Sequence, residues 1–307
     1  MMAHMKRTTS LILIFSATVG YGLMPIFTRI SYDGGMLPLE LVLLRFGGAA
    51  LILISFQLLT GRARELMTPT RTALRIVVNV GLPFTLVIVA KFYAFQTMPM
   101  GVVQAIFYGY PAWVMIIAAI KGRERLRLTN VIGYVVIFIG IVMTLDMSDM
   151  RISTLGVLLS VASMLLYGWY VTSIKHPEVL PVSSAVITTY TMTTGAVITA
   201  LLLLFTGPHE FSFHPSAWYG VAGLVFISSI GAFYAFNLGA KYVESSIAAI
   251  ICCFETIVTV IFELVFLSGQ YSIRQYAGIV LIPMGITFSL LFTIRAARGS
   301  RLQNIQE

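Results

Sequence analysis

The chain has 307 residues, of which 58% are hydrophobic and 10% are charged, and its mean hydropathy is +0.91. Soluble globular proteins carry about 25% charged residues, so this composition excludes an ordinary soluble protein and indicates an integral membrane protein. A formal net charge of +8 would suggest a nucleic-acid partner in a soluble chain. Here the basic residues lie in short loops, so no nucleic-acid partner is expected. The adjacent Cys252 and Cys253 lie in an apolar run, which excludes a disulfide framework and favours buried thiols.

Ten apolar runs are long enough to cross about 30 Å of hydrocarbon as helices. They lie near 9–31, 38–60, 72–97, 99–120, 128–146, 153–174, 182–206, 217–239, 245–267 and 275–295. The connections are short, so consecutive helices are expected to be antiparallel neighbours, and no soluble domain is expected. The first run is too long for a signal peptide and is interpreted as a retained helix. The predicted fold class is an all-α integral membrane protein with ten transmembrane helices.

The distribution of Lys and Arg predicts the orientation of these helices. If the N-terminus lies inside, the inner segments hold 14 basic residues, whereas the outer loops hold only Arg151 and Arg274. The 14 are Lys6, Arg7, Arg62, Arg64, Arg71, Lys121, Arg123, Arg125, Arg127, Lys175, Lys241, Arg295, Arg298 and Arg301. The positive-inside rule therefore predicts a multi-pass protein of the inner (plasma) membrane, with cytoplasmic tails at 1–8 and 296–307.

The second half of the sequence repeats motifs of the first half in the same order. The matches are Tyr21-Gly22 with Tyr167-Gly168, Thr60-Gly61 with Thr206-Gly207, FYAF at 92–95 with FYAF at 233–236, and Gly133 and Gly140 with Gly278 and Gly285. Five spans is an odd number, so the second copy enters the membrane from the opposite side. The sequence thus predicts two inverted five-helix repeats, 9–146 and 153–295, within one membrane domain. Such repeats are typical of transporters that open to either side of the membrane in turn.

A basic residue follows the Tyr-Gly pair in the first span of each repeat, namely Arg29 and Lys175. The other motifs are Arg45-Phe46 in the second span, Pro111 in the fourth and Phe254-Glu255 in the ninth. With these motifs in this order, the chain resembles the drug/metabolite transporter superfamily, specifically its ten-helix EamA-like transporter family. Similar proteins export amino acids and other small metabolites, and some carry drugs or sugars. The family often has Glu-Pro in the ninth span, whereas here Thr256 follows Glu255, so this chain lacks the proline that would break that helix.

The ninth span carries two glutamates in an apolar run. Glu255 and Glu263 are eight residues apart, about two helical turns, so they lie on one face. Further polar residues of that face are Ser245, Cys252 and Thr259. An ionised carboxylate at the bilayer centre costs a few kcal/mol, so the face is expected to border a hydrated path. Glu255 is a candidate for binding a substrate amine or coupling protons, with a structural partnership to a buried base as the alternative. Glu263 is a second proton-coupling candidate, although its place near the outer interface favours simple hydration.

Aromatic and polar residues on three other spans are candidates for lining the same path. The fourth span offers Gln104, Tyr108 and Tyr110 beside Pro111, which kinks the helix. The sixth span offers Ser163 and Tyr167, and Tyr21 occupies the matching place in the first span. Aromatic faces suit cations, but aromatic packing and hydroxyl-mediated helix contacts explain these residues equally well.

Charged and amide groups elsewhere in the spans suggest charge balance and gating. Lys91 either snorkels to the outer surface or balances the glutamates, and Arg45 is expected in an internal ion pair. The candidate gates are Tyr93 and Gln96 near the outside, and Tyr234 and Asn237 near the cytoplasmic end.

These features predict a secondary active transporter for a small amine-bearing metabolite, such as an amino acid or a polyamine, with export coupled to protons or exchange. A multidrug or cationic-compound exporter is the alternative. The sequence lacks an ATP-binding G-x-x-x-x-G-K-[ST] motif, and no ATPase subunit, cofactor or metal is expected.

An enzyme is disfavoured because no aspartate lies deep in a span and His4, His176, His209 and His214 lie in loops or the tail. A channel is disfavoured because the spans lack charged rings. The assembly is expected to be a monomer or a homodimer.

Overall fold

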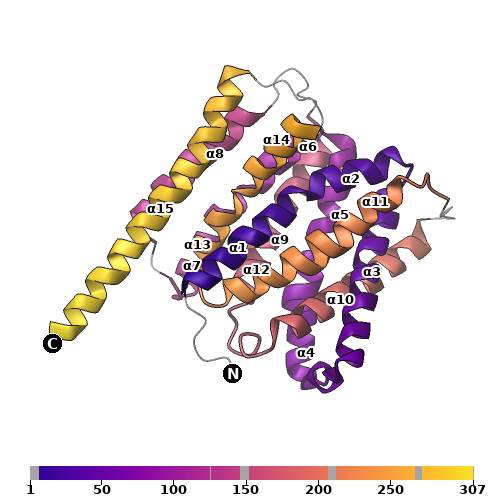
Figure 1. Ribbon diagram of the computed structural model, residues 1–307, viewed down its shortest axis with the longest axis horizontal. Helices are drawn as coiled ribbons and strands as arrows, with labels where there is room; N and C mark the ends of the chain where they lie inside the picture. Colours follow the sequence, from indigo (N-terminus) through magenta and orange to yellow (C-terminus); the bar gives the residue numbers. More distant parts are fainter. Residues whose placement is uncertain (1–6, 125, 146–151, 207–211, 267–271, 307) are drawn as a thin grey trace.

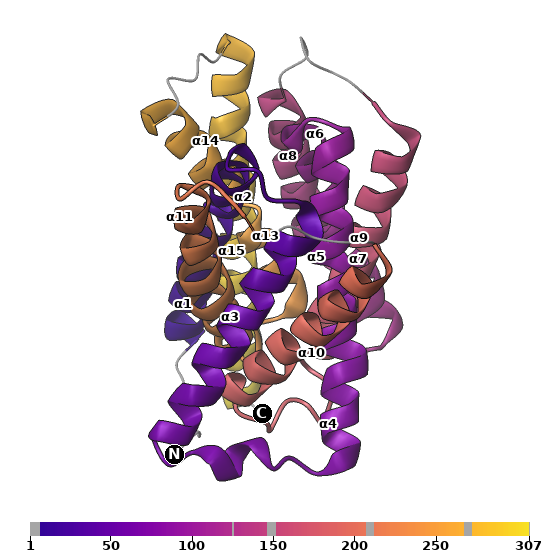
Figure 2. The same ribbon diagram turned by 90° about the vertical axis from the view of Figure 1, so that its right-hand side faces the viewer.

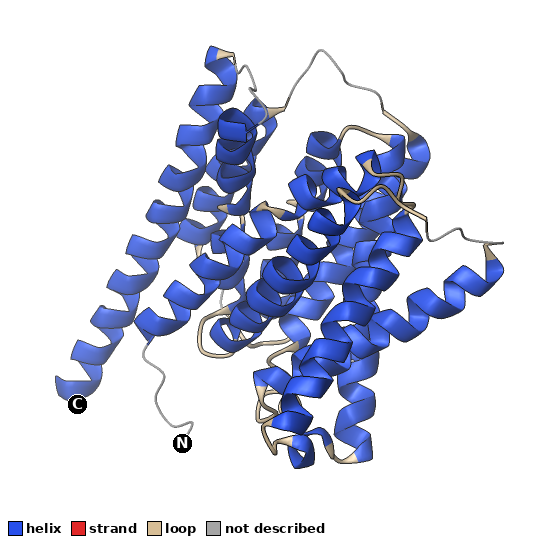
Figure 3. Ribbon diagram, turned by 45° about the vertical axis from the view of Figure 1, so that its right-hand side comes forward, coloured by secondary structure: helices blue, strands red, loops and turns tan. Residues whose placement is uncertain are grey.

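The computed structural model describes residues 7–124, 126–145, 152–206, 212–266 and 272–306, without the side chains of 263–266 and 293–306. Every regular element in these ranges is helical (Figure 3). Nine of the described helical segments are long and apolar enough to cross a membrane, and a tenth apolar helix, Leu128–Thr144, is shorter. The fold class predicted from the sequence is confirmed: this is an all-α, multi-pass membrane protein with ten spans in two inverted repeats.

The first five spans form one half of the molecule, and several of them consist of more than one helical segment. In chain order they are α1 (Arg7–Gly22) with α2 (Met24–Asp33), α3 (Pro38–Leu59), α4 (Thr70–Ile76) with the π-helix η2 (Val77–Gly81) and α5 (Leu82–Thr97), α6 (Met100–Phe107) with α7 (Tyr110–Ile120), and α8 (Leu128–Thr144). A short 3-10 helix, η1 (Ala63–Leu66), connects the second and third spans.

The other five spans repeat the breaks of the third and fourth spans but not the break of the first. They are α9 (Thr154–Ser173), α10 (Ser184–Phe205), α11 (Ala217–Ala222) with the π-helix η3 (Gly223–Ala232) and α12 (Phe233–Ala240), α13 (Ser245–Cys252) with α14 (Glu255–Phe266), and α15 (Ile273–Gln306). The third span of each half contains a π-helix, and the fourth span of each half is divided in two. The last helix continues beyond the predicted end of its span at 295 and is helical to Gln306.

The packing of the spans follows a two-fold pattern. Helix α3 packs on α10, α8 on α15 and α7 on α13, while the pair α1–α12 is matched by α9–α5. Figure 1 shows α8 and α15 side by side at one edge, and Figure 2 shows α10 beside α3. Consecutive spans also contact each other, as α3 does α5 and α7 does α8, but these contacts are less extensive. Short loops fix the direction of consecutive helices, but the most extensive contacts join spans of different halves, where complementary faces meet.

Glycines explain the closest of these contacts. A Cβ atom built on Gly140 would lie 2.8 Å from the carbonyl oxygen of Gly278, and one on Gly133 would lie 2.9 Å from that of Gly285. Small residues allow membrane helices to approach this closely. The glycines that reveal the repeat in the sequence are thus the contact surface between α8 and α15.

We expect Gly140→Ala to destabilise the protein by about 1–3 kcal/mol, because the new methyl group would clash with the backbone of α15. The measurement is the thermal unfolding midpoint of the purified protein in detergent. Gly47→Ala on α3 is the matched control, since a Cβ atom there meets nothing within 4 Å. Equal midpoints for the two variants would contradict the proposed contact surface.

Candidate functional site

The fourth and ninth spans are interrupted at equivalent places of the two repeats. Helix α6 ends before Tyr108 and Gly109, and α13 ends before Cys253 and Phe254, 145 residues later in each case. Pro111 accounts for the first break because proline cannot continue the hydrogen-bond ladder. The second break forms without a proline, through three-residue turns in which the Phe254 N–H donates to the carbonyl of Ile251 (2.9 Å). The missing proline therefore does not remove the break in the ninth span.

These breaks bring together a carboxylate and a phenol from opposite halves. Glu255, the first residue of α14, is only 7% exposed. The Tyr108 hydroxyl donates a hydrogen bond of 2.6 Å to Oε1 of Glu255. The hydroxyl of Tyr134 in turn donates to the carbonyl oxygen of Tyr108 (3.1 Å). The break in the fourth span is thereby fixed in place, and with it the phenol that orients the carboxylate.

Lys91 lies inside the helix bundle and does not reach the surface. Its side chain on α5 is 2% exposed, so the prediction that it snorkels to the outer interface is wrong. The ammonium lies 3.9 Å from the centre of the Phe107 ring, a cation–π contact. Lys91 and Glu255 lie within range of each other's charge. Within the described chain, however, the Lys91 ammonium forms no ion pair of 4.0 Å or less. Sequence reasoning missed Phe107, whose signal was its place directly before the break.

Arg45 is a second cation in the interior. Its side chain on α3 is fully buried, its Nε donates to Oγ of Ser229 (2.7 Å), and one terminal nitrogen contacts Sδ of Met24 (3.2 Å). The other terminal nitrogen has no hydrogen-bond partner among the described residues. The expected internal ion pair of Arg45 is thus absent from the described chain. Its partner is a serine on the π-helix η3, a position that a hydropathy pattern does not single out.

An aromatic cluster surrounds the breaks. The ring centres of Tyr110 and Tyr167 are 4.7 Å apart, and each lies 5.1 Å from that of Phe107. The Tyr110 hydroxyl donates to the carbonyl oxygen of Ala249 (3.1 Å), which ties the fourth span to the ninth. Tyr21 is also buried and lies within range of the charges of Arg45 and Glu255. Its hydroxyl has no partner in the described structure.

The remaining predicted site residues divide into two groups. Cys252 and Gln104 are buried beside the two breaks, on α13 and α6. Thr259 and Ser163 instead hydrogen-bond backbone carbonyls, those of Gly22 (2.7 Å) and Leu159 (2.7 Å) respectively, and their hydroxyls stabilise helices and helix contacts. The side chain of Glu263 lies outside the described part of the molecule.

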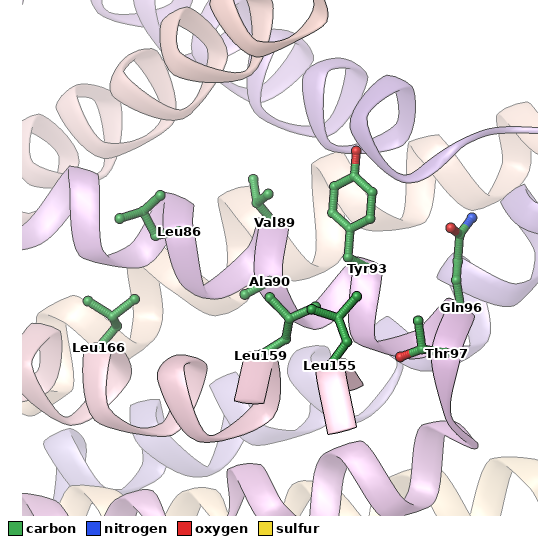
Figure 4. A pocket seen from close by; sticks show the side chains of 9 residues that line it. All are labelled: Leu86, Val89, Ala90, Tyr93, Gln96, Thr97, Leu155, Leu159 and Leu166. Atoms are coloured by element: carbon green, nitrogen blue, oxygen red, sulfur yellow. The ribbon is translucent and has the colours of Figure 1, made fainter. Parts of the chain in front are cut away.

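The four gate candidates occupy different environments. Tyr93 and Gln96 line a largely apolar cavity of about 370 Å³ between α5 and α9 (Figure 4). The other lining residues are Leu86, Val89, Ala90, Thr97, Leu155, Leu159 and Leu166, so Glu255 is not on the wall of this cavity. Asn237 is fully buried and accepts a hydrogen bond from the Tyr170 hydroxyl (3.0 Å), whereas Tyr234 is 39% exposed.

Ion pairs join the two halves at the end predicted to face the cytoplasm. These pairs are Arg71–Glu178 (3.5 Å), Arg75–Glu178 (2.7 Å), Arg127–Glu244 (3.1 Å) and Lys175–Glu124 (3.5 Å). At the opposite end, Arg29–Asp33 pairs residues of a single helix. Every ion pair between halves in the described residues therefore lies at one end of the molecule.

Glu124 is the most connected residue of this network, and sequence reasoning missed it. Its carboxylate accepts hydrogen bonds from the N–H groups of Ser245 (2.5 Å) and Ser246 (3.1 Å) and from the Ser246 hydroxyl (2.6 Å). Burial acts to raise the pKa of Glu124, but these hydrogen bonds and the charge of Lys175 outweigh burial and lower the pKa. The interaction is therefore fully present above the ordinary Glu pKa of about 4.3, and is lost as the pH falls through the lowered pKa. Its sequence signal was a single acid within the basic 121–127 loop.

We expect Glu124→Gln to weaken the contact between the two halves at this end of the molecule. The substitution replaces a carboxylate that accepts three hydrogen bonds and pairs with Lys175. Cys252 and Cys253, both buried, are the chain's two thiols, and a reagent reaches them only when the helices around them separate. Their labelling by a small thiol reagent at neutral pH should become about tenfold faster. Asp33→Asn at the other end is the control and should label as the wild type does. An unchanged rate for Glu124→Gln would show that the network does not hold the helices closed.

Comparison with known proteins places this architecture in a family. A crystal structure of a protein matches with a TM-score of 0.81 and 19% sequence identity, covering 95% of this chain and 99% of that chain. At that identity the likeness shows the fold alone. No curated protein sequence matches the chain. The sequence model of the EamA-like transporter family matches twice, over residues 8–146 and 154–291. The chain therefore belongs to the EamA-like transporter family of the drug/metabolite transporter superfamily.

Proposed function

We propose that the chain is a secondary active transporter that exports a small amine-bearing metabolite across the inner membrane in exchange for protons. Members of its family are transporters. The observation that carries the proposal is the buried pair of Tyr108 and Glu255, whose two residues belong to opposite inverted halves and meet where both helices are broken. A site between inverted repeats is reached from either side when the halves rock against each other.

The chemistry of this pair favours an amine. A carboxylate in a low-dielectric interior attracts an ammonium group more strongly than it would in water, because the interior screens charge less. The phenol of Tyr108 holds Oε1 of Glu255 in a fixed direction, and the rings of Tyr110 and Tyr167 supply faces that attract cations. In the proposed cycle Glu255 holds either a proton or the substrate ammonium, so one leaves as the other binds. Each turnover then exchanges substrate for a proton without ATP.

The ion-pair network supplies the closure at one end. It joins the halves through Glu124 and Glu178, whereas the described part of the opposite end has no such pairs between halves. Helix α13 begins at the residues bound by Glu124 and ends at the break beside Glu255. A movement of this short helix would therefore affect the closure and the proposed binding site together.

The distribution of basic residues supports cytoplasmic termini. The start of α1 and the end of α15 both lie at the lower end of the molecule in Figure 1. The 121–127 loop, which joins the network of Glu124, belongs to the segments predicted to lie inside. We propose that this end faces the cytoplasm of a cell whose inner membrane holds the protein.

We expect Glu255→Gln to reduce saturable counterflow at least tenfold and to abolish its stimulation by a pH gradient, because the amide can neither release a proton nor pair with an ammonium. The assay uses the purified protein in liposomes with amino acids, polyamines and cationic dyes as probes. Tyr108→Phe should weaken apparent affinity while leaving the pH response in place. Glu65→Gln in the exposed η1 segment is the matched control and should transport normally. Wild-type flux and pH response in Glu255→Gln would exclude the assigned role.

We expect green fluorescent protein fused after the C-terminus to fluoresce in bacterial cells, and alkaline phosphatase fused at the same place to be inactive, because phosphatase folds only outside the cytoplasm. Phosphatase inserted between Gly34 and Gly35, in the loop after the first span, is the control and should be active. Active phosphatase at the C-terminus would reverse the proposed orientation.

A further inference from the structure

Several buried polar atoms on the helices of the proposed binding site have no hydrogen-bond partner among the described residues: a terminal nitrogen of Arg45, the Tyr21 hydroxyl, Oε1 of Gln104 and the Thr256 hydroxyl. The Arg45 nitrogen and the Tyr21 hydroxyl can donate to an anion, whereas Oε1 of Gln104 can only accept. Arg45 is 0% exposed and Tyr21 is 7% exposed. Buried polar groups are nearly always paired, because an unpaired one has lost its hydrogen bonds to water without replacement. Arg45 contacts Met24 (3.2 Å), three residues after Tyr21, so the two groups belong to one part of the bundle, where a ligand would complete their hydrogen bonds.

The contacts of Arg45 fix the direction of its free nitrogen. The guanidinium is planar, and Ser229 holds its Nε while Met24 contacts one terminal nitrogen. Because the plane is defined by those two contacts, the remaining N–H groups point in one direction without further loss of side-chain freedom. This arrangement is a pre-oriented donor of the kind that recognises a carboxylate or a phosphate.

The described charges at the centre of the bundle do not balance. Among the side chains that the structure describes there, Arg45 and Lys91 are two buried cations and Glu255 is one carboxylate. Lys91 contacts the Phe107 ring and has no anion within 4.0 Å in the described chain. An unbalanced charge at mid-membrane is unfavourable, and a negative group brought in by a ligand would balance it.

We propose that Arg45 and Tyr21, supported by the charge of Lys91, form a subsite for an anionic group of the substrate. The transported metabolite then carries a negative group as well as the amine that faces Glu255. This inference rests on the proposed function and narrows its substrate class: a zwitterion fits both subsites, whereas a polyamine or a permanently cationic compound places positive charge beside Arg45.

The two subsites belong to different halves of the protein. Arg45, Tyr21 and Lys91 lie in the first repeat and Glu255 in the second. A zwitterion that occupies both subsites therefore bridges the halves, and a ligand shifts a conformational equilibrium only through such differential contacts. An amine without an anionic group reaches one half alone and is expected to be carried poorly.

The test compares matched probes in liposomes that contain the purified protein. The first series consists of amino acids. The second and third series are the same compounds without the carboxylate and without the amine, respectively. The fourth series consists of aminophosphonates. The amino acids or the aminophosphonates should show saturable counterflow at least tenfold faster than the amines and the acids. The comparison of the first and fourth series identifies which anionic group the subsite accepts.

The decisive variant is Tyr21→Phe, which removes a hydroxyl that has no hydrogen-bond partner among the described residues and leaves Arg45 in place. It should raise KM for the preferred zwitterion about tenfold, with little change in kcat and no loss of thermal stability. Tyr190→Phe is the matched control, because it removes a hydroxyl that bonds the Leu66 carbonyl (2.8 Å). That variant should lose stability and keep KM. Arg45→Gln should weaken transport of the zwitterion more than transport of the corresponding amine.

The outcomes separate this inference from the proposed function. Saturable counterflow of the amines at the rate of the amino acids, with an unchanged KM in Tyr21→Phe, overturns the anionic subsite and leaves the amine transporter in place. The absence of saturable counterflow for all four series in the wild type overturns both.

Discussion

A charge enclosed by apolar helices requires compensation from the protein, from water or from a ligand, and this requirement governs the centre of the molecule. Glu255 receives a hydrogen bond from Tyr108, Lys91 lies on the face of Phe107, and Arg45 binds Ser229 and Met24. None of these contacts joins two opposite charges. The helix breaks, the π-helix that carries Ser229 and the aromatic cluster each compensate a buried charge only in part. The charge that stays uncompensated is available to interact with a ligand.

The inverted repeat provides the scaffold of this centre but not its chemistry. At the offsets that align the two halves, Arg45 corresponds to Thr191, Lys91 to Ala232 and Glu255 to Tyr110. The backbone is therefore nearly symmetric, with matched breaks and matched helix pairs, while the charges are not. Each half contributes a different sign of charge, so a substrate with two opposite charges would interact with both halves at once.

One short helix connects the centre with the end that carries the ion pairs. Ser245 and Ser246 at the start of α13 bind the carboxylate of Glu124, and Cys252 at its end precedes the break and Glu255. The helix is buried along its length and contacts α7 from the other half. Packed interiors shift between discrete arrangements and do not deform continuously, so closure at the end and geometry at the centre are linked through this element.

The sequence by itself determined the ten spans, the inverted repeat and the family, because hydropathy, loop charge and motif order are properties read along the chain. It also singled out Glu255, Tyr108 and Arg45, since a polar residue in an apolar run is visible without any structure. Only the tertiary structure decided their partners: Tyr108 for Glu255, Ser229 for Arg45 and the ring of Phe107 for Lys91. It also formed the ninth-span break without a proline. Two of these pairings are hydrogen bonds between the two halves, made by residues more than 100 positions apart, and the third is a contact of a cation with a ring on the next span. Each depends on which helix faces meet, and such contacts leave no periodic trace in the sequence.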